Sequence, residues 1–308
     1  MSLAKMPLEK IAGSHWLPLS KAVQTVNGYA ALTKPRIMFL LLFTQYCAMI
    51  VAAGGLPTLH ATLFGLLGLA LSTGGAAAMN MWYDRDIDAV MTRTAQRPIP
   101  SGRIRARNAF WFGIALLILS IWVLGVFVNP LTALLSFAGF IYYVVVYTVW
   151  LKRRTPQNIV IGGGAGAFPP LVGWAAVTGH LGWTPWIMFL IVFLWTPPHF
   201  WALALYKQGD YQRAGIPMMP VVAGERSTKR QSLVYTGLLA AISISLYFTG
   251  RVGIDYLIAA VLLNGIFTVM EVMLLKNQGS DEWARRVFKY SILYLPILFI
   301  FMVMNVHH

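Results

Sequence analysis

Charge, acid and cysteine are all scarce in this sequence, and each shortage excludes a class of protein. Only 11% of the 308 residues are charged whereas 58% are hydrophobic, which leaves too little polar surface to enclose a soluble domain. The single cysteine, Cys47, excludes a disulfide framework and a thiolate metal site, and we interpret it as a small packing residue. Residues 1–30 lack the apolar segment and small-residue cleavage site of a signal peptide, so we expect a polar lead on the cytoplasmic side.

Apolar stretches near the roughly 20 residues needed to cross a bilayer recur along the whole chain. They predict an all-α, polytopic membrane protein in which residues 1–308 form one integral-membrane domain, with nine transmembrane helices around a central cavity. We expect the second and sixth helices to extend past the membrane edge. The predicted helices cover residues 37–55, 59–79, 109–128, 131–150, 159–178, 183–205, 233–250, 254–275 and 290–306.

The basic residues gather on one side of the predicted membrane. The net charge is +14, and 23 of the 24 lysines and arginines fall in the N-terminal lead or in alternate loops, with Arg251 alone on the other side. The positive-inside rule accounts for this distribution and places the N-terminus and these loops in the cytoplasm. Nucleic-acid binding would need a basic polar domain, so we expect no nucleic-acid partner. The expected location is a bacterial inner membrane, with membrane lipid around the helices.

Acidic residues are few, yet three of the ten lie within five positions directly after the second predicted helix. Asn80, Asp84 and Asp88 are four residues apart, so on a helix they drift by only about 40° per step and form one stripe, with Asp86 pointing roughly opposite. Mg²⁺ usually binds to proteins through a few carboxylates and substrate phosphates. A lone Asp there would be read as a solvated helix cap, but this spacing predicts a metal and diphosphate site at the membrane edge.

Two long loops occupy equivalent places after the second and sixth helices, at residues 80–108 and 206–232. Each loop has an acid near its start, Asp84 in the first and Asp210 in the second, and each continues into a proline-punctuated segment. Loops of this length in a compact protein are often functional. We infer a weak internal duplication, in which two four-helix units face each other and a ninth helix is added.

Basic side chains in these loops are candidates for binding a diphosphate. Arg93 and Arg97 follow the acidic stripe at helical spacing, and a guanidinium group matches phosphate oxygens in a bidentate fork. Lys207 and Asp210 are the corresponding candidates in the second loop. The alternative is that the basic residues are ordinary topology signals and that the isolated Asp210 caps a helix.

His199 lies inside the sixth predicted helix, after two prolines. If that helix continues to Asp210, the two side chains are offset by about 20° around the axis and about 16 Å along it. Ionisable residues at membrane depth usually face the protein interior, so His199 is either functional or a packed structural residue. The glycine-rich segment 162–167 lacks the context of a phosphate loop and is typical of close helix packing, or of a cavity for a bulky flat substrate.

These motifs resemble those of the UbiA superfamily of intramembrane prenyltransferases, and within it the branch that farnesylates haem. Asn80, Asp84 and Asp88 are similar to the first aspartate-rich motif of the superfamily. Its second motif generally carries a further acid where this chain has Ala214, and the haem-farnesylating branch shares that departure, which leaves the second half-site with fewer carboxylates. Four strings carry the resemblance to this branch: DIDAVMTRTAQRPIPSGRI (86–104), IGGGAGAFPPLVGWAAVTG (161–179), WTPPHFWALAL (195–205) and DYQRAGIPMMPVV (210–222).

The resemblance implies that farnesyl diphosphate, haem B and water react to give haem O and diphosphate. It implies Mg²⁺ as the cofactor, an allylic cation shielded from bulk water, and a His199 that contacts the haem iron or transfers a proton near the acceptor. An association with a haem A synthase or a terminal oxidase assembly is implied in the same way. The implied metal ligands are Asn80, Asp84, Asp88 and Asp210, and the implied diphosphate-binding residues are Arg93, Arg97 and Lys207.

Two alternatives to this function are open. Prenylation of another acceptor, such as a quinone precursor or chlorophyllide, would use the same residues to ionise the diphosphate and would differ only around His199 and residues 161–179. A secondary transporter with inverted repeats would place its acids near the bilayer midplane, whereas these acids are predicted at one membrane edge.

Overall fold

The computed structural model describes residues 21–277, 279 and 281–307. Within these residues, nine helices are long and apolar enough to cross a membrane, which confirms the predicted all-α, multi-pass architecture. The nine spans are α2 (Pro35–Ala53), α3 (Leu59–Tyr83), α5 (Ala106–Phe127), α6 with the π-helix η1 (Pro130–Ile141 and Tyr142–Leu151), α7 with α8 (Asn158–Gly162 and Gly164–Thr178), α9 (Trp183–Tyr206), α12 with η2 (Gly224–Ser245 and Leu246–Thr249), α13 (Ile254–Lys276) and α14 (Asp281–Met304).

Local signals set several helix ends. Asn129 caps α6, since its side chain accepts a 2.8 Å hydrogen bond from the backbone N–H of Thr132, and Pro130 follows at the first helical position. Gly54 and Gly179 end α2 and α8 in the left-handed conformation, with φ of 67° and 72°, where a side chain would be strained.

Two spans begin earlier than predicted. α12 begins at Gly224 and α14 at Asp281, nine residues before the predicted starts at 233 and 290. Hydropathy detects only the apolar part of a helix, and the first turns of both helices are polar. In α12 an i, i+4 ion pair between Glu225 and Lys229 (2.5 Å) stabilises this polar start. The expected extension of the second span is present, because α3 continues to Tyr83.

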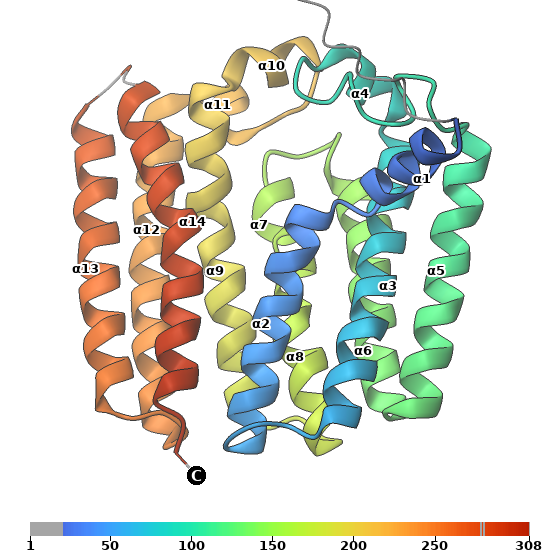
Figure 1. Ribbon diagram of the computed structural model, residues 1–308. Coiled ribbons are helices and arrows are strands. Elements are labelled where there is room, and N and C mark those ends of the chain that lie inside the picture. Colours follow the sequence, from blue (N-terminus) through green and yellow to red (C-terminus); the bar gives the residue numbers. More distant parts are fainter. Residues whose placement is uncertain (1–20, 278, 280, 308) are drawn as a thin grey trace, which may run out of the picture.

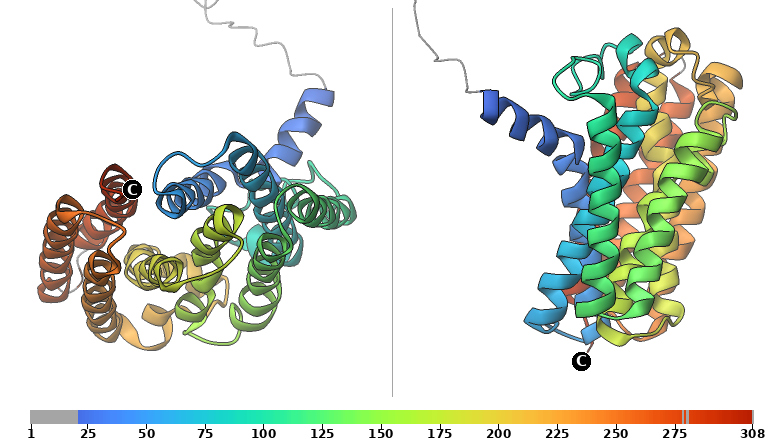
Figure 2. Two further views of the ribbon diagram at one scale, coloured as in Figure 1. Left: turned by 90° about the horizontal axis from the view of Figure 1, so that it is seen from below. Right: turned by 90° about the vertical axis from the view of Figure 1, so that its right-hand side faces the viewer.

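The long connections meet at one end of the bundle, here called the loop end. It carries α4 (Arg85–Val90), α10 (Gln208–Arg213) and α11 (Met219–Val222), while residue 307 lies at the opposite end (Figure 1). Seen along the bundle axis, the N-terminal helices occupy one side and the C-terminal helices the other (Figure 2). α3 packs against α5, α2 against α8, and α9 against both α12 and α14.

The N-terminal lead is only partly described. Residues 1–20 of the predicted polar lead lie outside the described residues, and the rest is not a simple polar lead, because Lys21–Leu32 forms the helix α1. α1 is anchored by apolar contacts, since Leu32 and Tyr29 pack with Met81, Ile104 and their neighbours. The prediction overlooked this short amphipathic segment because it is not hydrophobic enough to resemble a span.

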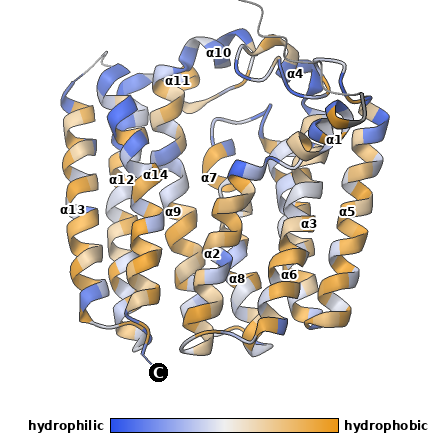
Figure 3. Ribbon diagram, viewed as in Figure 1, coloured by the Kyte–Doolittle hydropathy of each residue, from blue (hydrophilic) through white to orange (hydrophobic). Residues whose placement is uncertain are grey.

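Small residues allow close packing of the helices at the predicted glycine-rich segment. A Cβ atom at Gly162 would lie 2.1 Å from the Tyr147 ring, and one at Gly163 would lie 2.8 Å from the side chain of Thr196. The packing interpretation of this segment is therefore correct for both positions. Figure 3 shows that hydrophobic residues dominate the length of the helices and that hydrophilic residues concentrate at the loop end.

Candidate active site

The acidic stripe forms where α3 passes into α4. The backbone N–H of Asp84 donates to Asn80 O (2.9 Å), and the N–H of Asp88 donates to Asp84 O (2.8 Å), so helical register continues through the junction. Asn80, Asp84 and Asp88 are all at most 2% exposed, whereas the side chain of Asp86 is 61% exposed. The predicted stripe is confirmed as a geometric feature, with Asp86 directed away from it.

Each buried acid of the stripe has a cationic partner. Lys152 forms an ion pair with Asp84 Oδ2, and the Asn80 amide donates to the same oxygen (2.8 Å). Arg97 donates to both oxygens of Asp88, at 2.8 and 2.7 Å. These pairs offset the cost of holding two carboxylates out of water.

Asp86 pairs with Arg153, whose guanidinium also lies 3.7 Å from Asp84 Oδ1. Its two carboxylate oxygens accept 2.7 Å hydrogen bonds from the Arg153 guanidinium. The hydrogen bonds from Arg153 lower the pKa of the Asp86 carboxyl to about 2. Asp86 is therefore a surface acid with a structural partner, not a fourth member of the stripe.

Lys34 closes the cluster from the side of α2. Its ammonium donates to Asn80 Oδ1 (2.7 Å) and to the Tyr143 hydroxyl (3.2 Å). Burial, with help from the nearby charges of Arg97 and Lys152, lowers the pKa of Lys34 to about 7. Its backbone is left-handed, with φ 51° and ψ 60°, and it is the one non-glycine residue of the described chain with positive φ. Such strain, typically about 1–3 kcal/mol, is often found at functional sites.

A π-helix brings Lys152 and Thr148 to the acids. η1 runs from Tyr142 to Leu151, and the N–H of Lys152 donates to Tyr147 O (2.9 Å) in the five-residue spacing of a π-helix. Thr148 Oγ1 accepts a 3.0 Å hydrogen bond from the Asn80 amide. The wider helical turn therefore sets the direction of side chains that a regular helix would place elsewhere.

The second loop packs directly on the first. Thr92 Oγ1 donates to Asp210 Oδ1 (3.4 Å), which joins the two halves of the chain, and Asp210 also pairs with Arg213. Beneath these contacts, apolar residues of both loops form one buried cluster that includes Ile87 and Tyr211. The loop end is thus a single packed structure and not two independent loops.

Of the predicted basic residues, Arg97 belongs to the cluster, whereas Arg93 and Lys207 lie further out. Arg93 and Arg97 are not on a helix, because turns follow α4 from residue 91, where the Thr94 hydroxyl donates to Asp88 O (3.0 Å). The expected helical spacing of the two arginines is therefore wrong. Arg93 is exposed at the surface of the loop end. Lys207 is also exposed, with its ammonium 5.9 Å from the centre of the Tyr206 ring.

Tyr211 lies near charged residues from two other parts of the chain. Burial raises the pKa of its hydroxyl, and the nearby positive charges of Arg93 and Lys152 oppose that rise. Arg93 comes from the first loop and Lys152 from the end of the fourth span. Charges from two other parts of the chain therefore act at this residue next to Asp210.

His199 is held between aromatic rings in α9. Its imidazole stacks on Trp195 and Phe288, with ring centres 4.4 and 4.8 Å away. Nδ1 lies 2.7 Å from Ser291 Oγ, and that hydroxyl donates to Phe288 O (2.7 Å). A serine hydroxyl has one proton to donate. When Ser291 gives that proton to Phe288 O, Nδ1 carries the hydrogen that Ser291 accepts, and Nε2 of a neutral His199 keeps its lone pair.

The donor set of the acidic stripe fits Mg²⁺ only if substrate oxygens complete it. Within the described residues, no group of three His, Cys, Asp or Glu side chains could hold a metal ion alone. One buried oxygen, Asp84 Oδ1, has no hydrogen-bond partner and lies 3.7 Å from the nearest guanidinium nitrogen, that of Arg153. Two carboxylates, one amide oxygen and the oxygens of a diphosphate would form an ordinary magnesium environment.

Sequence reasoning overlooked Lys34 and Lys152 as part of this cluster. Both are among the basic residues that the positive-inside rule explains, and nothing in their sequence context separates them from the other cations. Their role depends on the left-handed turn before α2 and on the π-helix, neither of which hydropathy reveals.

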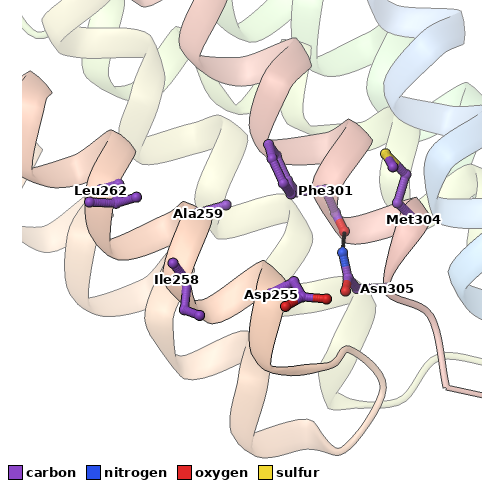
Figure 4. Close-up of a pocket in the computed structure, with 7 residues that line it drawn as sticks. All are labelled: Asp255, Ile258, Ala259, Leu262, Phe301, Met304 and Asn305. Carbon is purple, nitrogen blue, oxygen red and sulfur yellow. Dashed lines mark hydrogen bonds between the residues drawn. The ribbon is translucent and has the colours of Figure 1, made fainter.

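A pocket at the opposite end is unrelated to this cluster. It has a volume of about 410 Å³, lies between α13 and α14, and contains none of the predicted site residues (Figure 4). Asp255 and Asn305 are its polar residues, and the Asn305 amide donates to Phe301 O (3.0 Å).

Comparison with known proteins identifies relatives over nearly the whole chain. The model of the UbiA prenyltransferase family matches residues 41–293. A protoheme IX farnesyltransferase of Symbiobacterium thermophilum is 56% identical over 284 residues, which cover 92% of this chain and 95% of that protein. A protein of the same name from Agrobacterium fabrum is 52% identical over 277 residues, covering 89% of this chain and 87% of its own.

Solved structures share the fold. A digeranylgeranylglyceryl phosphate synthase superposes with a TM-score of 0.78 at 19% identity, covering 92% of this chain and 98% of its own. A UbiA homolog from Archaeoglobus fulgidus bound to DMAPP and Mg²⁺ gives a TM-score of 0.62 at 17% identity, covering 90% of this chain and 99% of its own. The family model spans most of the chain, and relatives above 50% identity span nearly all of it. The chain therefore belongs to the UbiA prenyltransferase family.

Proposed function

We propose that this protein transfers the farnesyl group of farnesyl diphosphate to a vinyl group of haem B, with addition of water, to give haem O. The observation that carries the choice of substrates is the 56% identity over 284 residues to a protoheme IX farnesyltransferase. The buried stripe with its cationic partners supports a diphosphate site. We treat the chain as one catalytic domain.

Mg²⁺, when bound, would neutralise the leaving diphosphate and ease its departure. Asp84 and Asp88 would exchange Lys152 and Arg97 for the metal. These two cations, together with Lys34, would then be free to hold the diphosphate oxygens. The residues proposed to hold the metal are Asn80, Asp84, Asp88 and Asp210.

The exposed residues Arg93 and Lys207 are proposed to contact the diphosphate from the outer edge of the site. Arg93 is suitable because its charge already acts at Tyr211, next to Asp210. Lys207 would have to leave the ring of Tyr206 to reach a diphosphate. We therefore propose Arg97 and Arg93 as the stronger contributors and Lys207 as the weaker one.

His199 is proposed to contact the haem iron through Nε2. With Ser291 donating to Phe288 O, the proton of the imidazole lies on Nδ1, and an imidazole binds a metal through its unprotonated nitrogen. The rings of Trp195 and Phe288 hold the imidazole plane in place. This arrangement would orient the macrocycle relative to the prenyl donor.

We further propose that the loop end faces the cytoplasm of a bacterium. The support is the gathering of 23 of the 24 lysines and arginines in the N-terminal segment and the loops of that side. An association with a haem A synthase or a terminal oxidase assembly stays a prediction.

A direct assay tests the proposed reaction. Purified protein in proteoliposomes would receive Mg²⁺, haem B and farnesyl diphosphate, and mass spectrometry would search for the hydroxyethylfarnesyl haem. The expected result is product that depends on all three additions. Activity on a phenolic or chlorin acceptor, with none on haem B, would contradict the choice of acceptor. Absence of prenyl transfer to every acceptor would favour a transporter.

A further inference from the structure

A second pocket, shallow and open to the surface, lies at the loop end, outside the acidic cluster. It has a volume of about 430 Å³ and lies where the end of α3 meets the start of α5. Two arginines and two aromatic rings dominate its walls, which are formed by Trp82, Arg85, Ala106, Arg107 and Phe110.

Both arginines of this pocket lack an acidic partner within the described part of the chain. Arg85 donates to the backbone oxygen of Trp82 (2.8 Å), and its guanidinium carbon lies 5.7 Å from the centre of the Trp82 ring. Arg107 is exposed and forms no ion pair. The nearby acids are already engaged, since Asp84 pairs with Lys152 and Asp86 with Arg153. The pocket therefore carries two guanidinium groups available to an anion.

An apolar stripe continues from the pocket along α5. Trp111, Ile118 and Trp122 lie four, eleven and fifteen residues after Arg107, so all three share its face within about 60°. Their exposures of 57, 62 and 54% show that the described protein leaves more than half of each side chain uncovered. From Arg107 to Ile118 the stripe is about 16 Å long, which is close to half of a hydrocarbon core roughly 30 Å thick.

We propose that this pocket binds the headgroup of an anionic phospholipid from the leaflet at the loop end. Arg85 and Arg107 hold the phosphate oxygens, since guanidinium groups match them in a fork. One acyl chain lies along the apolar stripe of α5. A free phosphate would use the arginines alone and leave the stripe uncovered, whereas a phospholipid matches both. Basic pockets between membrane helices are known to recognise lipid headgroups in this way.

Binding there has a structural consequence for the neighbouring acids. Trp82 and Arg85 flank Tyr83 and Asp84, at the junction where α3 passes into α4. A phosphate shared by Arg85 and Arg107 ties this junction to the first turn of α5. The lipid therefore stabilises the segment that carries Asp84.

Native mass spectrometry with defined lipids tests the site. The wild-type protein, an Arg85→Gln/Arg107→Gln variant and an Arg226→Gln/Arg230→Gln control would be titrated with phosphatidylglycerol and with phosphatidylcholine. The control removes the same charge from exposed arginines at the start of α12. Phosphatidylglycerol affinity should fall about 30-fold in the pocket variant and stay within about twofold in the control. The wild type should prefer phosphatidylglycerol to phosphatidylcholine.

Three results would overturn the proposal. Equal loss of affinity in the two variants would mean that general surface charge attracts the lipid. Displacement of phosphatidylglycerol by glycerol phosphate alone would mean that the pocket takes a free phosphate. Wild-type affinity in Arg107→Gln, a single change at an exposed position that leaves the fold intact even if the double variant does not fold, would remove the pocket from lipid binding. The test needs no catalytic activity, so it is independent of the proposed reaction.

Discussion

A comparison of the activity and stability of Asp84→Asn with those of Asp86→Asn tests whether Asp84 is a catalytic carboxylate and Asp86 a structural one. The two acids are two residues apart and carry the same charge, yet Asp84 is fully buried and Asp86 is 61% exposed. Asparagine keeps the size of the side chain and removes the charge. A difference in activity or stability between the two variants is therefore caused by the position of the acid, because the chemical change is the same in both.

The structure gives the expected size of each effect. Removing the charge of Asp84 leaves Lys152, whose side chain is 16% exposed, without its partner. Breaking such a buried pair typically costs 3–5 kcal/mol in the free energy of unfolding. Asparagine can still accept one hydrogen bond from Lys152, so we expect about 3 kcal/mol. The Asp86 pair with Arg153 is exposed and screened, so we expect at most about 1 kcal/mol.

Activity should separate the two variants further. Losing one group that stabilises charge in a transition state commonly lowers kcat by about 10²–10³-fold, which we expect for Asp84→Asn. We expect Asp86→Asn to stay within about twofold of the wild type. Both would be assayed in proteoliposomes by mass spectrometry of the haem product, after size-exclusion chromatography has shown that each is folded. Near-normal turnover of Asp84→Asn, or equal losses in both variants, would refute the assignment.

Four further predictions address the rest of the site. Ser291→Ala should weaken haem binding by about tenfold and broaden the haem spectrum, because His199 loses the hydrogen bond that fixes its tautomer; an unchanged spectrum would count against iron contact. Thr92→Val should raise the KM for farnesyl diphosphate by up to about fivefold through loss of one hydrogen bond to Asp210, while Thr92→Ser stays normal. The pKa of Asp86 is lowered to about 2 in the folded protein, below its unfolded value near 4. Its ion pair with Arg153 therefore stabilises the fold fully above pH 4, and this stabilisation is lost as the pH falls through about 2. The difference in Tm between wild type and Asp86→Asn should accordingly be constant from pH 5 to 8. Chelation of Mg²⁺ should abolish turnover but leave Tm unchanged, since Lys152 already neutralises the buried acid.

The sequence was sufficient for features that repeat with a simple period. Nine apolar runs predicted nine spans, and the spacing of Asn80, Asp84 and Asp88 predicted a stripe that the helical hydrogen bonds across the α3–α4 junction maintain. Both depend on local rules, namely the length of a membrane helix and its 3.6-residue turn. The metal and diphosphate roles of these residues stay predictions.

Features that depend on tertiary contacts could not be predicted. Lys34 joins the cluster through a left-handed backbone turn, and Lys152 through ten residues of π-helix. Neither conformation has a sequence signature in an apolar run. The helical spacing assigned to Arg93 and Arg97 was wrong for a related reason, since side-chain contacts such as the bond from Thr94 to Asp88 O favour turns there.

The basic partners of Asp84 and Asp88 explain how these acids can be buried at this site and what they are suited to bind. Two buried carboxylates, Asp84 and Asp88, pair with Lys152 and Arg97, and the amine of Lys34, whose pKa is lowered to about 7, lies next to them on Asn80. Carboxylates alone would be costly at a membrane edge, so the cations keep the cluster folded when nothing is bound. These basic groups would suit an anion that arrives with Mg²⁺, because the acids would hold the metal and Lys34, Arg97 and Lys152 would then be available to bind the anion. A transporter that moved a cation would gain nothing from basic side chains paired with its acids. The charge of the cluster therefore favours diphosphate chemistry on physical grounds that do not depend on the relatives.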